Sequence, residues 1–308
     1  RVLFRSTVSV LFEQFLANVA IEKSKATYIG YKRWCEMFSK EYGAKPVDYI
    51  TKAVALNYRT SLLQHARRYA PKTINHAIIA VRRAWNWGIE QELIEGPNPF
   101  SKLKSLPSQG RKRIATNEEF KRLLNASVPQ FRKVLLMMRH TPARPQDIYN
   151  MKWSNVDFAN SMIIIHEHKT SKTAKTPKPR IFGISKVVLE VLEECRKQNT
   201  GKEHVFLNMK GKPWTKDALV QQMSKLRKRL GIAKDKNGEN FVLYTNRHTF
   251  LTKAGQDPTI SSSILQELAG HSDPRTTSRY VHHDKQIVAD ATIKVSESVF
   301  GKGGDKDG

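Results

Sequence analysis

Apolar side chains recur at helical spacing through the first hundred residues, and no strand pattern interrupts them. This periodicity predicts several amphipathic helices, because residues three and four apart share one helix face. We expect helices to begin after caps at Ser6-Thr7, Ser24 and Thr51, and at Pro71. The residues expected to face the core are Val8, Leu11, Phe12, Phe15, Leu16, Val19, Tyr28, Tyr31, Cys35, Phe38, Ile74, Ile78, Val81 and Trp85.

The helical pattern ends at residues 96–99, which read Gly-Pro-Asn-Pro, and a stretch of mostly Ser, Lys, Arg and Gly follows. That composition is typical of an exposed hinge, and 308 residues suit two domains. We expect a helical domain over 1–100, a basic linker over 101–113 and a second domain over 114–300. The tail, 301–308, holds only Gly, Lys and Asp and is expected to be disordered.

The second domain mixes helix and strand patterns. Polar, Lys- and Thr-rich residues separate its two apolar runs, which indicates a long, cationic hairpin. The expected elements are a helix opened by a capping box at Thr116–Glu119, a helix over 131–138, strands at 162–165 and 181–184, a helix capped by Ser185, a short strand at 205–207 and a helix capped by Thr215. The fold class is therefore mainly α with a small β-sheet, a helical domain followed by a mixed α+β domain.

Charge indicates the partner. The chain has 53 Lys and Arg against 28 Asp and Glu, a formal net charge of +25, which repels itself unless a polyanion binds. Nucleic acid is the leading candidate and an anionic membrane surface the second. Residues 1–105 hold 17 basic and 8 acidic side chains, so both domains are basic, as expected of a protein that wraps a DNA duplex. No apolar run approaches the roughly 18 residues of a membrane span.

The two cysteines, Cys35 and Cys195, lie far apart within helical patterns, which argues against a disulfide framework or a zinc site and favours a reducing compartment. His166 and His168 share a strand face, and His282-His283 lies near the C-terminus, but no third and fourth ligand stands nearby, so we expect no metal. The chain begins with Arg rather than Met, so we expect its natural N-terminus to lie upstream.

Three segments of the second domain carry polar residues where packing would be expected. The first runs Thr-Pro-Ala-Arg-Pro-Gln-Asp-Ile over 141–148, and the second runs Tyr-Thr-Asn-Arg-His-Thr-Phe over 244–250. The third runs Leu-Ala-Gly-His-Ser-Asp over 268–273, and Tyr280 follows its histidine by nine residues. Each segment alone would be weak evidence.

Together the segments resemble the tyrosine recombinase family of phage integrases and Xer proteins, in which a Gly/Ala-Arg, a His-x-x-Arg-His and a Gly-His segment precede a nucleophilic tyrosine. The resemblance covers the second domain. It implies a helical core-binding (SAM-like) domain over 1–100 and a catalytic domain over 114–300, closing as a C-shaped clamp on double-stranded DNA. The first domain fits in pattern but has no motif of its own.

The resemblance further implies a site-specific recombinase that cuts and rejoins DNA through a 3′-phosphotyrosyl intermediate and a Holliday junction, without metal, ATP or other cofactor. Such an enzyme would act as a tetramer on its DNA site, in the cytoplasm with the nucleoid, with an accessory directionality factor as a further partner.

Carried over residue by residue, the resemblance makes Tyr280 the nucleophile, Arg144 and Arg247 the catalytic arginines and His271 the histidine of the Gly-His segment. An in-line attack on a phosphodiester builds negative charge on its non-bridging oxygens, and two guanidiniums suit that charge. Asp147, three residues after Arg144, matches the acidic position that supports the site.

The lysine of the hairpin is expected at Lys169, with Lys172 as the alternative, and would protonate the leaving 5′ oxygen. Tyr244 replaces the usual first histidine, and a phenol with a reference pKa near 10 is a poor proton shuttle at neutral pH. We expect Tyr244 to hold the phosphate by a hydrogen bond, with simple packing as the alternative, and His248 to support the site.

Further basic residues are expected to contact DNA, with a solvated surface as the alternative. They are Arg67, Arg68, Arg82, Arg83, Arg111, Lys112, Arg113, Lys172, Lys225, Arg227, Lys228 and Arg229.

Bland interpretations stand beside these. Arg144 alone could cap a helix, and Tyr280 alone could be a half-buried helix residue. A type IB topoisomerase uses a similar catalytic set, but the helical first domain argues against it. A DNA-binding regulator without activity is the rival from another class, and the intact arginines and tyrosine favour an enzyme.

Overall fold

The computed structural model describes residues 6–108, 110–166, 179–281 and 293–294. Contacts within the chain divide it into two compact units, Arg1–Gly110 and Arg111–Gly308. Each unit has its own hydrophobic core.

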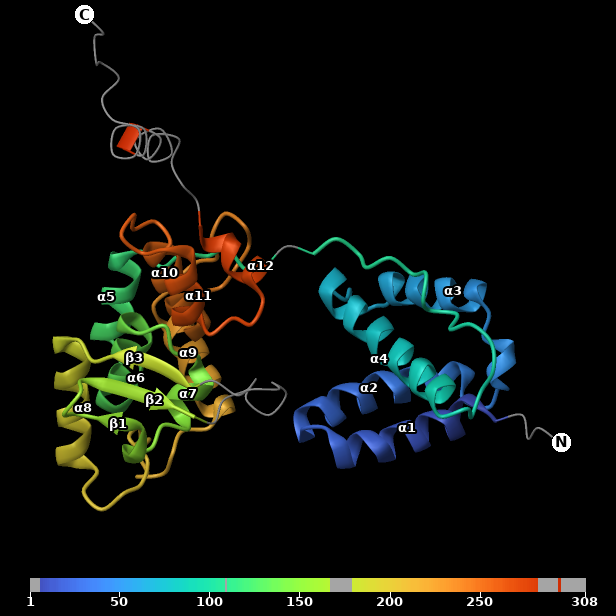
Figure 1. Cartoon of the computed structure of the whole chain (residues 1–308), viewed down its shortest axis with the longest axis horizontal. Helices are drawn as coiled ribbons and strands as arrows, with labels where there is room; N and C mark the ends of the chain where they lie inside the picture. Colours follow the sequence, from blue (N-terminus) through green and yellow to red (C-terminus); the bar gives the residue numbers. More distant parts are fainter. Residues whose placement is uncertain (1–5, 109, 167–178, 282–292, 295–308) are drawn as a thin grey trace, which may run out of the picture. The chain divides into compact units, whose positions relative to one another are not determined.

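The first unit is helical in its described part, as the periodicity predicts (Figure 1). Thr7, Ser24 and Thr51 each accept a hydrogen bond from the backbone N–H three residues on, so all three predicted caps are confirmed. Its elements are α1 (Val8–Glu22), α2 (Lys25–Tyr42), the 3₁₀ turn η1 (Val47–Tyr49), α3 (Lys52–Gln64) and α4 (Pro71–Glu90).

Aromatic rings fill the centre of this unit. The ring of Phe38 lies 5.8 Å from that of Phe12, in a tilted arrangement, and 4.7 Å from that of Tyr58, edge to face, between centroids. Aromatic pairs of this kind add to area burial. Most residues predicted for this core are buried. Leu16, Tyr28 and Tyr31 are only partly buried and pack at its margin.

The segment predicted as an exposed linker from residue 101 packs against the first unit instead. Leu103 is buried in its core, and Asn75 pairs with the backbone of Leu106 through two hydrogen bonds of 2.8 Å. The two leucines explain the docking, because their apolar side chains cover part of α4 in a segment that is otherwise polar.

The second unit combines helices with one three-stranded antiparallel sheet of strand order β1-β2-β3. Its elements are α5 (Asn117–Asn125), α6 (Pro129–His140), α7 (Pro145–Tyr149), η2 (Trp153–Asn155), β1 (Val156–Asp157), β2 (Met162–Ile165), β3 (Arg180–Gly183), α8 (Lys186–Gln198), α9 (Lys216–Arg229), α10 (Leu243–Ala254), α11 (Ser262–Ala269), α12 (Pro274–Thr277) and η4 (Ser278–Tyr280).

The predicted hairpin strands and the capping box are confirmed. Met162 pairs with Gly183 and Ile165 with Arg180, while Thr116 and Glu119 bond to each other's backbone N–H. The connection over 167–178 lies outside the described residues.

The predicted short strand at 205–207 is wrong. Only isolated bridges occur there, between Lys152 and His204 and between Leu207 and Pro213. Val205, Phe206 and Leu207 are nevertheless buried. Their apolar run therefore reflects a loop that packs on the core, which short apolar runs do not distinguish from a strand.

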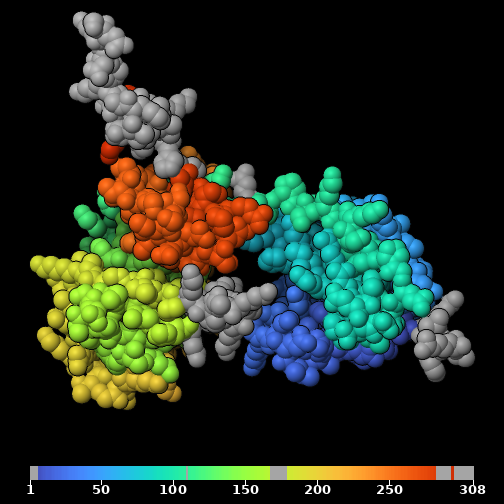
Figure 2. Space-filling view, in the orientation of Figure 1, coloured from blue at the N-terminus to red at the C-terminus, as the bar shows by residue number. Residues whose placement is uncertain are grey.

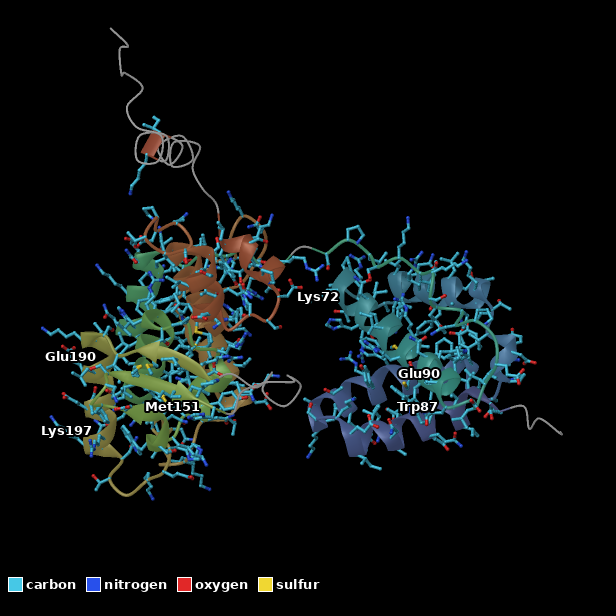
Figure 3. The ribbon with its side chains drawn as sticks, viewed as in Figure 1. Lys72, Trp87, Glu90, Met151, Glu190 and Lys197 are labelled. Atoms are coloured by element: carbon cyan, nitrogen blue, oxygen red, sulfur yellow. The ribbon has the colours of Figure 1, made fainter. Side chains whose placement is uncertain are left out.

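Helix α6 lies at the centre of the second unit and packs against both α8 and α10. In Figure 3, Glu190 and Lys197 project outward from α8, whereas Met151 lies in the interior. The helix α8 thus turns its apolar face to α6 and its charged face to solvent, as its periodicity predicts. In the part of the chain that the structure describes, no helix is long and apolar enough to cross a membrane.

Candidate active site

Arg144 is placed by the start of α7, which follows the turn after α6. Its backbone N–H donates to the Asp147 carboxylate at 2.9 Å, so the first turn of the helix fixes its position. The Arg144 side chain extends to the end of α11, where its Nη2 donates to the carbonyl oxygens of Ala269 at 3.3 Å and Gly270 at 3.2 Å. The backbone of Arg144 therefore caps α7, while its guanidinium lies beside the end of α11.

Arg247 lies on α10 and is completely buried. Its guanidinium donates to the carbonyl oxygens of Pro142 and Ala269. The carbonyl of Ala269, at the end of α11, therefore receives both arginines and brings the first and second motif segments together. Tyr244, one turn earlier on α10, places its ring 5.9 Å from the Arg247 guanidinium carbon and is 37% exposed.

Gly270 caps the C-terminus of helix α11 and adopts the left-handed conformation with φ 56°. His271 follows, and its Nδ1 lies 3.0 Å from the hydroxyl oxygen of Thr277. Burial, together with the positive charges of Arg247 and Arg144, lowers the pKa of His271 to about 4. The ring is therefore neutral at pH 7 before DNA binds.

Tyr280 ends η4 and is 3% exposed. Its ring lies 5.2 Å from that of His248 and 6.2 Å from that of His271, nearly parallel to the latter. Burial raises the pKa of Tyr280, although Arg247 and Arg144 oppose the shift. The phenol is therefore protonated at neutral pH and needs a proton acceptor to act as a nucleophile.

Gly255, just after α10, lets the tyrosine segment come this close. A Cβ on Gly255 would lie 2.1 Å from the carbonyl oxygen of Tyr280, where no side chain fits. A single missing Cβ thus allows η4 to pack beside α10.

The site is strongly electropositive. Arg144, Arg180 and Arg247 are near enough to perturb one another, and Asp147 is the one carboxylate bonded to them within the described residues. Burial first, then repulsion from Arg247 and Arg180, lowers the pKa of Arg144 to about 10, which still leaves it charged at pH 7. Such a cluster favours an anion.

Each of the two motif arginines has one buried donor that finds no protein partner among the described residues: Nη1 of Arg144 and Nε of Arg247. A buried donor without a partner costs free energy, so an acceptor placed at these two nitrogens would be stabilised. Planar guanidiniums match the oxygens of a phosphate group. Among the residues that the structure describes, no cluster of three or more His, Cys, Asp or Glu could hold a metal ion.

The structure brings together most of the predicted catalytic set. Segments 144–147, 244–248 and 271–280 surround the end of α11, and in Figure 2 the orange surface of α10 onwards borders the green-to-yellow surface of the strands. Lys169 and Lys172 lie outside the described residues, as do His168, His282 and His283.

Ten of the residues predicted to bind DNA divide into two groups, whereas Arg113 is buried and Lys172 lies outside the described residues. Arg82 and Arg227 are half-buried and donate to the carbonyls of Leu103 and Phe241. Those with exposed side chains are Arg67, Arg68, Arg83, Arg111, Lys112, Lys225, Lys228 and Arg229.

Arg113 is a correction, because it is 3% exposed. Its guanidinium pairs with Glu119 and donates to the carbonyls of Ala233 and Glu239. Arg113 therefore stabilises the interior of the second unit and is not available to a phosphate.

Four residues of the site were missed by sequence reasoning: Arg180, Thr277, Gly255 and Asn246. Arg180 had a signal, because it stands two residues before buried Phe182 on β3 and so shares the inward face. Asn246 lies inside the second motif but is fully buried, and neither polar atom of its amide has a partner among the described residues. Nothing in the sequence marked Thr277 or Gly255.

Comparison with known proteins agrees with this geometry. The sequence model of the phage integrase family matches residues 113–287. The chain is 27% identical to the tyrosine recombinase XerC of Bacillus pumilus, covering 89% of this chain and 92% of that protein. It is also 27% identical to the tyrosine recombinase XerA of Pyrococcus horikoshii, covering 95% and 96%.

Solved structures show the same fold. The Tn1549 transposon integrase in complex with transposon right end DNA matches with a TM-score of 0.78 at 19% identity, over 94% of this chain and 99% of that one. The lambda integrase tetramer bound to a Holliday junction matches with a TM-score of 0.74 at 17% identity, over 91% and 78%. The family match spans more than half of the sequence, and it favours the recombinase interpretation over the topoisomerase one. The chain belongs to the phage integrase family of tyrosine recombinases, enzymes that cleave and rejoin DNA through a tyrosine.

Proposed function

We propose that Tyr280 is the nucleophile of this recombinase and that Arg144 and Arg247 bind the scissile phosphate. The Tyr280 oxygen forms a bond to phosphorus, and the bond from phosphorus to the 5′ oxygen breaks. The products are a 3′-phosphotyrosyl bond and a free 5′ hydroxyl. The phenol loses a proton, and the 5′ oxygen gains one.

The observation that carries this proposal is a pair of buried donors, Nη1 of Arg144 and Nε of Arg247, which have no partner among the described residues and lie beside a buried tyrosine. Nη2 of Arg144 and both Nη atoms of Arg247 donate to backbone carbonyls of residues 142, 269 and 270, so the guanidiniums are fixed before the substrate arrives. Donors organised in advance stabilise the charge that develops on the phosphate, and removing one typically costs about 3–4 kcal/mol of barrier.

Proton transfer falls to His271 and to the hairpin lysine. Thr277 occupies Nδ1 of His271, which leaves Nε2 for the substrate or the phenol. A neutral imidazole can accept a proton, and its low pKa before DNA binds keeps it neutral. Lys169, or Lys172 in its place, would protonate the 5′ oxygen, and Tyr244 would donate a hydrogen bond to the phosphate.

Asp147 and His248 are assigned supporting roles. Asp147 bonds to the backbone of Arg144, and the ring of His248 packs on Tyr280, so each holds one reacting group.

We propose that both units bind double-stranded DNA through the exposed basic residues given above. Four copies would assemble on paired sites and exchange strands through a Holliday junction. The lambda integrase tetramer, which shares this fold, supports that assembly. We further propose that the complex is associated with the nucleoid and that an accessory protein sets the direction of recombination; both rest on the family resemblance.

A strand-exchange assay tests the proposal. Two labelled duplexes from DNA flanking the gene are incubated with the protein in EDTA, and products are resolved on denaturing gels. Wild type is expected to give adducts and recombinant strands, whereas Tyr280→Phe binds the same DNA and gives neither. Specific binding without an adduct by wild type would favour the non-catalytic regulator. Relaxation of supercoils by a single site, without recombinants, would favour a topoisomerase.

A further inference from the structure

Arg180 occupies a position where a charge is unexpected. It begins β3, on the face shared with buried Phe182, while Ile181 between them is 50% exposed. The arginine itself is only 4% exposed. Burying a guanidinium costs several kcal/mol unless its partners compensate, so its contacts are informative.

Its main partner is the carboxylate that places Arg144. Nη1 of Arg180 donates to both oxygens of Asp147, at 3.0 and 2.9 Å. One of these oxygens also accepts the backbone N–H of Arg144 at 2.9 Å. One carboxylate therefore joins the first residue of β3 to the residue that starts α7.

The side chain of Arg180 also lies against the loop that receives the Arg144 guanidinium. A Cβ on Gly270 would lie 2.7 Å from Nε and 3.2 Å from Cδ of Arg180, so the glycine leaves room for this arginine. The carbonyl of Gly270 accepts a hydrogen bond from Arg144. Arg180 thus contacts both groups that fix Arg144. Asp147 accepts the backbone N–H of Arg144, and Gly270 accepts a hydrogen bond from the Arg144 guanidinium.

We propose that Arg180 is a positioning residue that sets the placement of the Arg144 guanidinium on the scissile phosphate. The proposal rests on the phosphate-binding role proposed for Arg144. Arg180 acts through Asp147 and Gly270 and does not itself contact the reacting atoms. Because it also begins β3, it ties the hairpin to the first arginine.

Arg180→Gln tests this assignment on two substrates that differ at the scissile phosphate. In a methylphosphonate a methyl group replaces one charged oxygen, so less negative charge develops and a well-placed Arg144 matters less. Arg180→Gln is expected to slow single-turnover cleavage of the ordinary phosphodiester by about 10- to 100-fold. The methylphosphonate should be slowed by less than about threefold relative to wild type. Arg144→Lys should show the same split.

A purely structural role would slow both substrates equally, and that result would overturn the proposal, as would an unchanged rate on both. Lys133→Gln is the matched control, because Lys133 is a 5% exposed cation of the same unit, paired with Glu194 on α8 at 3.1 Å. It should lower thermal stability without a split between substrates.

If Arg180→Gln does not fold, Arg180→Lys keeps the charge with fewer donors and should give a smaller loss with the same split. Absence of any adduct with wild type would instead refute the proposed function, so the two failures are distinguishable.

Discussion

Replacing Gly255 by Ala should disable strand cleavage while leaving the fold and DNA binding intact. The added Cβ would lie 2.1 Å from the carbonyl oxygen and 2.8 Å from the carbonyl carbon of Tyr280, and ordinary contact begins near 3.4 Å. The backbone of Tyr280 must therefore move by about 1 Å, because backbone cannot yield as a flexible side chain does. The backbone of Gly255 itself is helical, so alanine brings no dihedral strain.

The shift sets the magnitude. A misplacement of about 1 Å costs on the order of 100-fold in rate, equivalent to about 2.7 kcal/mol of barrier. We expect single-turnover adduct formation on a nicked duplex to slow by that factor. Affinity for the same duplex should change by less than about twofold, since the substitution removes none of the basic side chains proposed to contact DNA.

Gly30→Ala is the matched control. Gly30 lies within α2, and a Cβ there meets nothing within 4 Å, so alanine should raise stability by about 0.5–1 kcal/mol and leave cleavage unchanged. Cleavage by Gly255→Ala within about twofold of wild type would refute the reasoning. It would mean that Tyr280 does not react from the position it occupies beside α10.

Three further predictions concern the same unit. Asn246→Leu removes two buried polar atoms that have no partner in the described part of the chain, and should raise the free energy of unfolding by about 1–3 kcal/mol, measured by urea titration. A loss of stability would instead indicate a bound water. Arg113→Gln should destabilise the unit by about 2–4 kcal/mol and leave the slope of log DNA affinity against log salt concentration unchanged. Lys228→Ala should reduce the magnitude of that slope by about 0.9. A reduced slope for Arg113→Gln would show that Arg113 does contact DNA. The pKa of His271 is lowered to about 4, so this histidine binds fewer protons in the folded than in the unfolded state. The free energy of unfolding should therefore fall as pH drops from about 6.5 towards 4, and it should fall less in His271→Gln. An identical pH dependence in the two proteins would contradict a neutral His271 ring.

Much of the first unit could be predicted because local signals agree with one another. Caps at Thr7, Ser24 and Thr51 mark helix starts that the apolar periodicity also requires. The packing of Leu103 could not be predicted, since two leucines in a polar segment do not reveal which surface they cover.

The clustering of the candidate site residues could be predicted because their motifs lie on short segments with unusual polar residues. The sequence did not reveal which residues outside the motifs form hydrogen bonds and ion pairs with the motif residues. Arg180 reaches Asp147 across 33 residues, a contact that depends on the register of β3 rather than on any local pattern. The basic character of Arg113 suggested DNA, but its contacts with Glu119 and two carbonyls are tertiary and exclude that role.

The identity of the reacting tyrosine tests the account most directly. Tyr244 and Tyr280 both lie near Arg247, so an adduct alone does not distinguish them. Wild-type protein is trapped on a nicked duplex, the complex is digested with protease and nuclease, and the nucleotide-bearing peptide is sequenced by mass spectrometry. We predict a nucleotide joined through its 3′ phosphate to Tyr280, and Tyr244→Phe should retain the adduct. A nucleotide on Tyr244, or an adduct that survives in Tyr280→Phe, would contradict the proposed site.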